Sequence, residues 1–381
     1  MNMTKKAIIY ADNAATTKLD IDAFEAMKPY LLDEYGNASQ PYTFARKSKQ
    51  ALKEARAIIA KCINAEPEEI YFTSGGTESD NWAIKGVAFA NTEKRQTITS
   101  TIEHHAILRS CKAIEKLGYP VTYLPVNSNG IVAPETLDSV ITSATSLVSI
   151  MLANNEIGTI EPIKDLCGIT HKHGALFHTD AVQAVGHIKI DVKELDVDML
   201  SASAHKFNGP KGIGFLYIKK GTPISQYTSG GSQEFGLRAG TENVASIVGM
   251  AVALKKNCAT IAENTKYVQE LEEELLNDLS DAGLDFIRNG SSEHIPGNIS
   301  LSFKNADGEA LLHRLDLMGI YISTGAACDT VNTQISHVIE SIGIDTQYAF
   351  GTIRISLGKD NDFSDVHQIA KSLSAILSPN K

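Results

Sequence analysis

Short apolar segments alternate along the chain with longer stretches in which apolar residues recur at helical spacing, such as 44–63. The apolar segments lie at 69–73, 97–100, 121–125, 146–152, 175–179, 197–201 and 213–218. Segments that are apolar throughout are typical of strands buried on both faces of a sheet, and helical patterns or Asn/Gly turns separate most of them. The pattern therefore predicts an α/β fold with a doubly wound, mainly parallel sheet.

The order of predicted helices and strands changes after Gly230 and Gly231. A helical pattern at 244–280 is followed by strand patterns at 298–303 and 352–357, a helix near 307–317 and a final helix. We predict a large domain at 21–250 and a smaller α+β domain at 251–381, with the long helix starting as the connector between them. The first 20 residues are predicted to pack on the small domain.

Composition and charge narrow the class of protein. The 381 residues include 35 basic and 45 acidic side chains, giving a formal net charge of −10 and an ordinary globular composition. Net acidity argues against a surface that binds nucleic acid along its whole length, so no direct nucleic-acid contact is expected. No apolar run approaches 18 residues and the N-terminal one is too short for a signal peptide, so we predict a cytoplasmic protein without a membrane span.

The cysteines and histidines do not form a recognisable metal or disulfide pattern. The five cysteines are Cys62, Cys111, Cys167, Cys258 and Cys328, an odd number without a C-x-x-C pair. Neither a disulfide framework nor a zinc finger fits this spacing. The histidine pairs 104–105 and 171/173 lie apart, without a carboxylate or cysteine at ligand spacing, so no metal is predicted.

Polar residues follow the predicted strands at the edge where open α/β sheets bind ligands. Gly75, Gly76 and Thr77 come first, at the start of a helical stretch. Glycines allow close approach of the backbone, and free amides at a helix N-terminus favour an anion, so this segment is a candidate phosphate cradle. The alternative is an ordinary helix start with Glu78 in its first turn. A Walker motif is excluded because no Gly-Lys-Ser/Thr follows.

Two other strand ends supply a possible cofactor pair. Lys206 follows a buried strand and precedes a Gly/Pro loop, and Asp180 ends another buried strand. A pyridine cofactor needs a carboxylate at its ring nitrogen and a lysine for its aldehyde, and these two residues provide both. Ser203 and His205 are candidate phosphate partners, and His104 could stack on the ring. The alternatives are a solvated loop lysine and a structural histidine.

The motifs in order resemble those of the pyridoxal-phosphate (PLP) enzymes of the class V aminotransferase family, and within it the cysteine desulfurases of the NifS/IscS group. The resemblance extends over nearly the whole chain. Its motifs are YADNAATT (10–17), TSGGTESDN (73–81), Glu103-His104, NNEIG (154–158), HTDAVQ (178–183), SAHK (203–206), GPKG (209–212), RAGT (238–241) and STGAAC (323–328), followed by Arg354. It implies the PLP-dependent transferase fold type I, with a seven-stranded sheet in the large domain.

The resemblance also implies roles for individual residues. Lys206 would form the Schiff base with the cofactor, Asp180 would pair with the ring nitrogen, and His104 would stack on the ring and act in acid/base steps. Asn155 and Gln183 would lie at the ring hydroxyl, with Asn155 also near the substrate. Gly76, Thr77, Ser203 and His205 would hold the phosphate. In a homodimer, Thr241 would reach the phosphate of the neighbouring subunit, and Arg354 would clamp the substrate carboxylate.

Cys328 distinguishes a desulfurase from an ordinary aminotransferase in this resemblance. L-cysteine would be converted to L-alanine, with its sulfur passing to the Cys328 thiolate as a persulfide and then to a protein acceptor. The following residue, Asp329, departs from the family pattern and should disfavour the thiolate. Open alternatives are a selenocysteine lyase, a class V transaminase or β-lyase, and a binding subunit without turnover. The sulfur pathway is equally open among iron-sulfur assembly, tRNA thiolation and DNA phosphorothioation.

Overall fold

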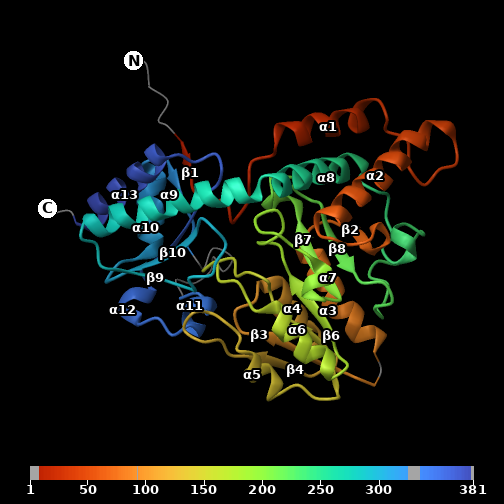
Figure 1. Ribbon diagram of the computed structural model, residues 1–381, viewed down its shortest axis with the longest axis horizontal. Helices are drawn as coiled ribbons and strands as arrows, with labels where there is room; N and C mark the ends of the chain where they lie inside the picture. The colour runs from red at the N-terminus through yellow and green to blue at the C-terminus, as the bar shows by residue number, and fades with distance from the viewer. Residues whose placement is uncertain (1–7, 92, 325–334, 379–381) are drawn as a thin grey trace.

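A seven-stranded sheet forms the centre of the large domain in the computed structural model, which describes residues 8–91, 93–324 and 335–378 (Figure 1). The strands in spatial order are β2 (Ile70–Thr73), β8 (Gly214–Ile218), β7 (Met199–Ser203), β6 (Leu176–Asp180), β5 (Thr145–Ser149), β3 (Gln96–Ser100) and β4 (Val121–Leu124). Every one of them overlaps a predicted strand. The predicted α/β fold with a mainly parallel sheet is confirmed.

Strand β8 differs in direction from the other six strands of the sheet. It runs antiparallel to both of its neighbours, β2 and β7, whereas the other adjacent pairs are parallel. Strands β2, β3, β5, β6 and β7 therefore all end at the same edge of the sheet. Polar side chains that follow these five strands meet there, as expected for an open α/β sheet.

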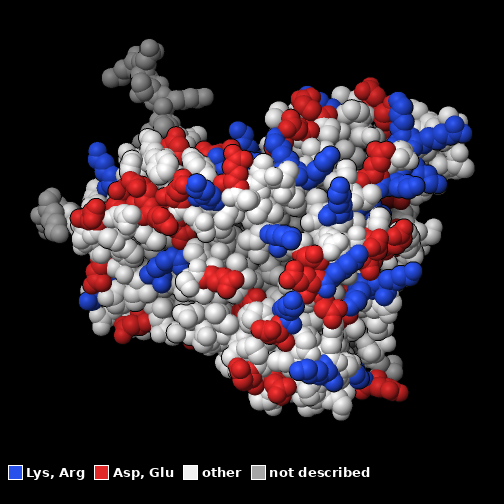
Figure 2. All heavy atoms as spheres, viewed as in Figure 1, with Lys and Arg blue, Asp and Glu red and all other residues white. Residues whose placement is uncertain are grey.

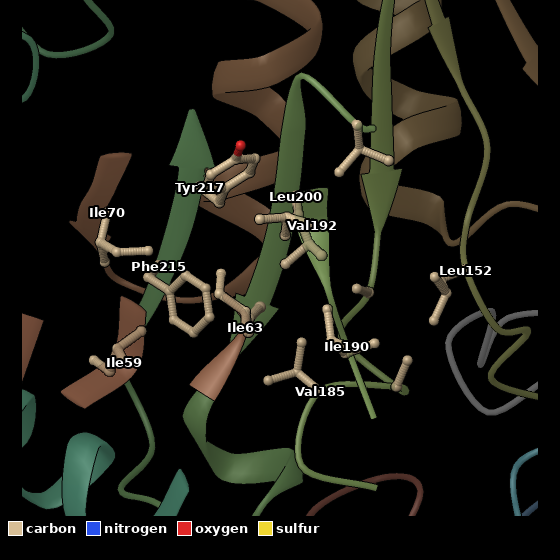
Figure 3. Close-up of a cluster of buried hydrophobic side chains, with 14 of the residues drawn as sticks. Ile59, Ile63, Ile70, Leu152, Val185, Ile190, Val192, Leu200, Phe215 and Tyr217 are labelled. Carbon is tan, nitrogen blue, oxygen red and sulfur yellow. The ribbon is translucent and has the colours of Figure 1, made fainter. Parts of the chain in front are cut away.

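Helices cover both faces of this sheet. They are α1 (Ile21–Leu32), α2 (Arg46–Cys62), α3 (Gly76–Ala90), α4 (His105–Glu115), α5 (Pro134–Asp138), α6 (Ile163–Lys172), α7 (Val192–Leu195) and α8 (Val244–Ala259), with short 3₁₀ turns η1 (Thr43–Ala45), η2 (Pro67–Glu69), η3 (Ala204–Lys206) and η4 (Glu234–Gly236). On one face, Ile59 of α2 packs with Leu200 and Phe215 (Figure 3), and Leu254 of α8 belongs to the same cluster. On the other, Trp82 of α3 packs with Met199 and Leu216. Consecutive strand residues thus point to opposite cores.

The small domain has its own three-stranded antiparallel sheet. Strand β10 (Asn298–Phe303) lies between β12 (Thr352–Ser356) and β9 (Phe286–Arg288). The helices of this domain are α9 (Ile261–Asp281), α10 (Gly308–Leu317), α11 (His337–Ser341), α12 (Thr346–Ala349) and α13 (Phe363–Leu377). Leu271 and Leu275 of α9 pack with Ile369 of α13 in a separate buried cluster.

Figure 2 shows acidic and basic side chains mixed over one face of the molecule.

The N-terminal segment contacts both domains. Strand β1 (Ile9–Tyr10) pairs in parallel with β11 (Ile320–Tyr321), and Ile9 lies in the small-domain core. A few residues later the Thr17 amide donates to the carbonyl of His205, and the Asp20 amide donates to that of Asn208. Residues 12–16 therefore span the gap between the two domains.

The helical pattern at 244–280 is not one helix, which corrects the sequence prediction. Helix α8 ends and α9 begins at Thr260, and the two axes differ by 71°. The bend follows from packing, because α8 contributes Leu254 to the large-domain core whereas α9 contributes Leu271 to the small-domain core. The limit predicted between residues 250 and 251 stays a prediction. Within the described ranges no single helix has the length and apolar character to cross a membrane; α8 and α9 meet the criteria of length and composition only when taken together as a bent pair.

Candidate active site

A cavity of about 570 Å³ lies at the carboxyl edge of the large sheet. Most of the predicted site residues line it: Gly76, Thr77, His104, Asn155, Asp180, Gln183, Ser203, His205, Lys206 and Arg354. One side, which we call the large-domain wall, is formed by Gly76, His104, Asp180 and Lys206. The lining residues Asp12, Ser323 and Arg354 come from the N-terminal segment and the small domain, and we call them the small-domain wall. The structure thus brings together residues that are far apart in the sequence.

Lys206 is held in place by its backbone and by its side chain. It ends the turn η3 directly after β7, and its carbonyl oxygen lies 2.8 Å from Nε2 of His187. Its Nζ donates to the carbonyl oxygens of Ala14 at 2.5 Å and Ala15 at 2.9 Å. The amine is therefore a positioned group at the cavity, unlike a solvated loop lysine.

Asp180 is a buried carboxylate at the end of β6. It is 5% exposed, and its Oδ1 accepts a 2.9 Å hydrogen bond from the Val182 amide. Burial raises its pKa to about 6, while the Val182 amide and the charge of Lys206 oppose the shift. A cationic partner in the cavity would offset the cost of burying this carboxylate further.

His104 presents a neutral ring to the cavity. It caps α4, and its Nδ1 accepts a 3.1 Å hydrogen bond from the Ala106 amide, so the ring proton is on Nε2. Burial, together with the charge of Lys206, lowers its pKa to about 4. The preceding residue, Glu103, is anchored by Ser100 and by the Met151 amide, which fixes the start of the helix.

The segment 75–77 has the geometry of an anion cradle. Gly75 has φ = 146°, a conformation that favours glycine, and a Cβ on Gly76 would lie 2.6 Å from Cγ2 of Val182. Helix α3 begins at Gly76, so its first amides have no partner within the helix. Glu78 of the first turn is paired with Arg238 at 2.8 Å, which offsets its charge. The segment is both an ordinary helix start, with Glu78 in the first turn, and a candidate phosphate cradle, because the amides at the start of the helix form the cradle.

Ser203 and His205 stand at the cradle from the other side. A Cβ on Gly75 would lie 3.5 Å from Oγ of Ser203, which shows how close the end of β7 comes to the start of α3. Nδ1 of His205 lies 3.1 Å from Oγ1 of Thr16. Burial lowers the pKa of His205 to about 4, and the nearby charge of Lys206 adds to the shift. The ring is neutral at pH 7 and can donate or accept one hydrogen bond.

Arg354 forms the charged part of the small-domain wall. Only 6% of the residue is exposed, and its Nη1 donates to the carbonyl oxygen of Asn155 at 2.8 Å. Its Nη2 donates to Oδ1 of Asp12, also at 2.8 Å. Its Nε is buried and has no hydrogen-bond partner among the described residues. The guanidinium lines the cavity, and its planar group of donors suits a ligand carboxylate.

Three features of the site were not predicted from the sequence. Asp12 pairs with Arg354 across 342 positions of the chain, and the carbonyls of Ala14 and Ala15 bind the Lys206 amine. The motif at 10–17 was recognised but given no role. Asp80, in the motif at 73–81, is buried beside Asp180 and was also overlooked.

Of the predicted residues that the structure describes, Thr241 is not among those that line the cavity. Thr241 is exposed and lies in the loop before α8. Cys328 and Asp329 lie outside the described residues. The other four cysteines are in helices, and burial raises the pKa of the Cys111 and Cys167 thiols, with nearby carboxylates adding to the shift. Those two thiols are therefore inert packed groups.

The sequence profile of the aminotransferase class-V family matches residues 9–369. The chain belongs to the aminotransferase class-V family. This family consists of enzymes that generally depend on PLP, which agrees with the cofactor class expected from the sequence. The resemblance noted in the sequence is confirmed.

Relatives and solved structures narrow the similarity within the class-V family. A protein named cysteine desulfurase IscS, from Dictyoglomus turgidum, is 47% identical over 98% of this chain and 95% of its own length. A solved structure of a NifS-like protein is 40% identical, with a TM-score of 0.92 over 98% of this chain and 100% of its own. A structure of SspA in complex with cysteine is 36% identical, with a TM-score of 0.82 over 92% and 99% of the two chains.

Proposed function

We propose that this class-V chain is a PLP-dependent cysteine desulfurase, which converts L-cysteine to L-alanine and passes the sulfur to Cys328 and then to an acceptor. The observation that supports it most is the meeting of Lys206, Asp180 and Arg354 around one cavity, because the first two suit the cofactor and the third suits an amino-acid carboxylate. The names of the relatives and the cysteine bound in the SspA structure support the same substrate.

The residues present fit the cofactor. The cavity has a buried carboxylate, Asp180, whose burial disfavours its charge unless a cation pairs with it. It has an amine at Lys206. At the cradle it has Ser203, His205 and the first amides of α3, which have no partner within the helix. Asp180 would hold the ring nitrogen, Lys206 the aldehyde, His104 the ring face, Asn155 and Gln183 the hydroxyl, and Gly76, Thr77, Ser203 and His205 the phosphate. When bound, PLP supplies an electron sink that acidifies the α-hydrogen of an amino acid.

The protein groups provide the proton transfers and the orientation. Arg354, fixed by Asp12 and Asn155, would bind the substrate carboxylate with its guanidinium and so orient the α-carbon. The amine of Lys206 takes the α-hydrogen as a general base, since the Ala14 and Ala15 carbonyls keep it at the cavity. The neutral His104 carries its proton on Nε2 and can return a proton to the product.

Sulfur transfer requires a nucleophile, and we assign this role to Cys328. Its thiolate attacks the sulfur of the substrate, the new S–S bond forms, and the substrate C–S bond breaks with its electron pair left on carbon. Protonation of that carbon gives L-alanine, and Cys328 is left as a persulfide. A protein acceptor then takes the terminal sulfur.

A paired assay tests this function. Alanine and sulfide formed from L-cysteine with dithiothreitol are measured for the wild type and Cys328→Ala, with the visible absorbance of bound PLP recorded for both. We expect the wild type to form both products, and the variant to bind PLP equally but form neither. Equal turnover by the variant would mean that Cys328 is not the nucleophile, and a lyase or transaminase activity would replace the desulfurase proposal.

We also propose a cytoplasmic homodimer in which Thr241 of each subunit reaches the phosphate cradle of the other. Thr241 is exposed, so it is available to a second copy. Large apolar side chains near α1 are exposed as well, including Leu32 at 72% and Tyr35 at 70%. Sedimentation should give twice the chain mass, and Thr241→Ala should weaken PLP binding in the dimer. A monomer with full PLP affinity would exclude this arrangement.

A further inference from the structure

A second carboxyl lies directly behind Asp180. Asp80 belongs to α3, one turn after the cradle, and only 1% of it is exposed. Its neighbours are Asp180 and His178 of β6 and Ser201 of β7. The proposed chemistry does not use Asp80, although it lines the inner end of the same cavity. A buried acid next to the residue expected to hold the ring nitrogen needs a physical explanation.

The two carboxyls are close enough to influence each other's protonation. An oxygen of each lies within 4.8 Å of an oxygen of the other, and only 1% of Asp80 and 5% of Asp180 is exposed. Two ionised carboxylates offer only acceptors, so a hydrogen bond between them requires a proton on one. Both groups are buried, where a second adjacent negative charge would be costly. The pair is therefore stable with one proton and one negative charge.

The surroundings place that proton on Asp80. Asp180 accepts from the Val182 amide and lies near the charge of Lys206, and both favour its ionised form. Oδ1 of Asp80 has no hydrogen-bond donor among the described residues, the nearest imidazole nitrogen, Nε2 of His178, being 3.9 Å away. Burial first, and then the charge of Asp180, raise the pKa of Asp80 well above its ordinary value.

A chain of hydrogen bonds in the centre of the sheet ends at Ser201, a neighbour of Asp80. Oγ of Ser149 lies 2.9 Å from Nδ1 of His178, and Nε2 of His178 lies 2.9 Å from Oγ of Ser201. Burial lowers the pKa of His178 to about 3, so this ring is neutral and has one N–H. With the proton on Nε2, His178 accepts from Ser149 and donates to Ser201, so the Ser201 hydroxyl keeps its own proton for an acceptor on the side of Asp80.

We propose that Asp80 is a positioning residue that keeps a proton and donates a hydrogen bond to Asp180, so that the ionised carboxylate of the pair is the one available to a ligand in the cavity. The other titratable groups that face the pair are His178, Glu103, His104 and Lys206. The consequence for PLP, which rests on the proposed function, is that Asp80 fixes the geometry and the basicity of the carboxylate that holds the ring nitrogen.

Infrared spectroscopy of the protein without cofactor tests the position of the proton. A protonated carboxyl has a C=O stretching band that a carboxylate lacks. At pH 7, the difference between wild type and Asp80→Asn should show loss of a C=O band, whereas Asp180→Asn should show loss of a carboxylate band. The reverse assignment, or loss of a carboxylate band in Asp80→Asn, would overturn the proposal. This measurement gives its answer whether or not the chain binds PLP.

Cofactor affinity tests the effect on Asp180. Asp80→Asn keeps a neutral hydrogen-bond donor, so its PLP dissociation constant should stay within about twofold of wild type. Asp80→Leu has no donor and should bind PLP about 10-fold more weakly, as expected for loss of a hydrogen bond to a charged group. The matched control is Glu161→Gln, a buried acid away from the pair whose pKa burial also raises, and it should leave PLP affinity unchanged. An equal loss in Asp80→Asn and Asp80→Leu would contradict a donor role and overturn the proposal.

Discussion

The two walls of the cavity are built in different ways. Each residue of the large-domain wall lies just after a strand of one sheet or at the start of a helix packed on that sheet, so its position depends on the turns and cores of a single domain. In the small-domain wall, Arg354 of β12 is held by Asp12 from the N-terminal segment and by Asn155 from the large domain. One wall is fixed within a domain, whereas the other depends on contact between domains.

The two walls contain groups suited to different parts of the proposed reaction. The groups suited to the cofactor and to proton transfer, Asp180 and Lys206, belong to the rigid wall. The group suited to the substrate carboxylate, Arg354, belongs to the wall that the domain contact holds. We therefore expect changes in the large-domain wall to affect the chemical step most, and changes in the small-domain wall to affect substrate binding and the domain contact.

Lys206→Ala should have the largest effect. Without its amine the site loses both the covalent attachment of the cofactor and the general base, and kcat should fall by about 10⁴-fold. The measurement is alanine formation under saturating PLP and L-cysteine. Lys211→Ala is the matched control, because Lys211 lines the same cavity but is exposed. A loss below about 10-fold in Lys206→Ala would remove the large-domain wall from the chemical step.

The contact between the two domains at Glu156 should make the free energy of unfolding depend on pH. The carboxyl of Glu156 accepts a 2.5 Å hydrogen bond from Oγ of Ser336, and burial raises its pKa to about 7, although Ser336 and the charge of Arg354 oppose the shift. The folded protein therefore binds this proton more tightly than the unfolded chain. The stabilisation is complete below about pH 4.5, and is lost as pH rises toward 7, with a total on the order of 3 kcal/mol.

Urea unfolding of wild type and Glu156→Gln between pH 5 and 8 measures this contribution. The wild type should lose unfolding free energy over this range, and the variant, which cannot ionise at this position, should lose less. Glu340→Gln is the control, because Glu340 is exposed on the nearby helix α11. Parallel pH profiles for wild type and Glu156→Gln would show that this contact does not respond to pH.

Arg354→Gln should raise KM for L-cysteine by about 100-fold, because a charge-assisted pair with the substrate carboxylate is lost. We expect kcat to fall much less, since Lys206 and Asp180 remain in place. Arg354→Lys should recover part of the affinity but not the forked geometry. Arg314→Gln, on the small-domain helix α10, is the control for loss of an arginine elsewhere. A fall in kcat with unchanged KM would assign Arg354 to the chemical step and erase the difference between the walls.

The sequence predicted the large-domain wall well for a physical reason. Buried strands give continuous apolar runs, and the residues that follow them are ordered along the chain, so β2, β3, β5, β6 and β7 and their polar ends could be located. The limits of the strands were predicted less accurately. Strand β5 ends at Ser149, although residues 150–152 stay buried and the amides of Ile150 and Leu152 still donate to β6. The reversed direction of β8 and the bend at Thr260 were not predicted, because a change of partner leaves the local hydrophobic pattern intact.

The small-domain wall was predicted less completely because its contacts are not local. Arg354 was found only through the resemblance, and its pairing with Asp12 joins residues 342 positions apart. Backbone carbonyls such as those of Ala14 and Ala15 have no residue-type signal at all. Asp80 was overlooked for another reason, since an acid within a helical pattern is normally exposed, and only the packing of α3 on the sheet buries it.

Asp12→Asn should have the smallest effect and separates orientation from charge in the small-domain wall. The amide keeps the shape of Asp12 and can still accept from Nη2 of Arg354, but the ion pair is lost. We expect KM for L-cysteine to rise by about 5- to 10-fold with kcat nearly unchanged, since one charge-assisted bond becomes a neutral one. In the double variant Asp12→Asn/Arg354→Gln, the Asp12 change should add little, because its effect acts through Arg354. If the two changes multiply instead, Asp12 contacts the substrate independently, and the small-domain wall has two binding groups rather than one.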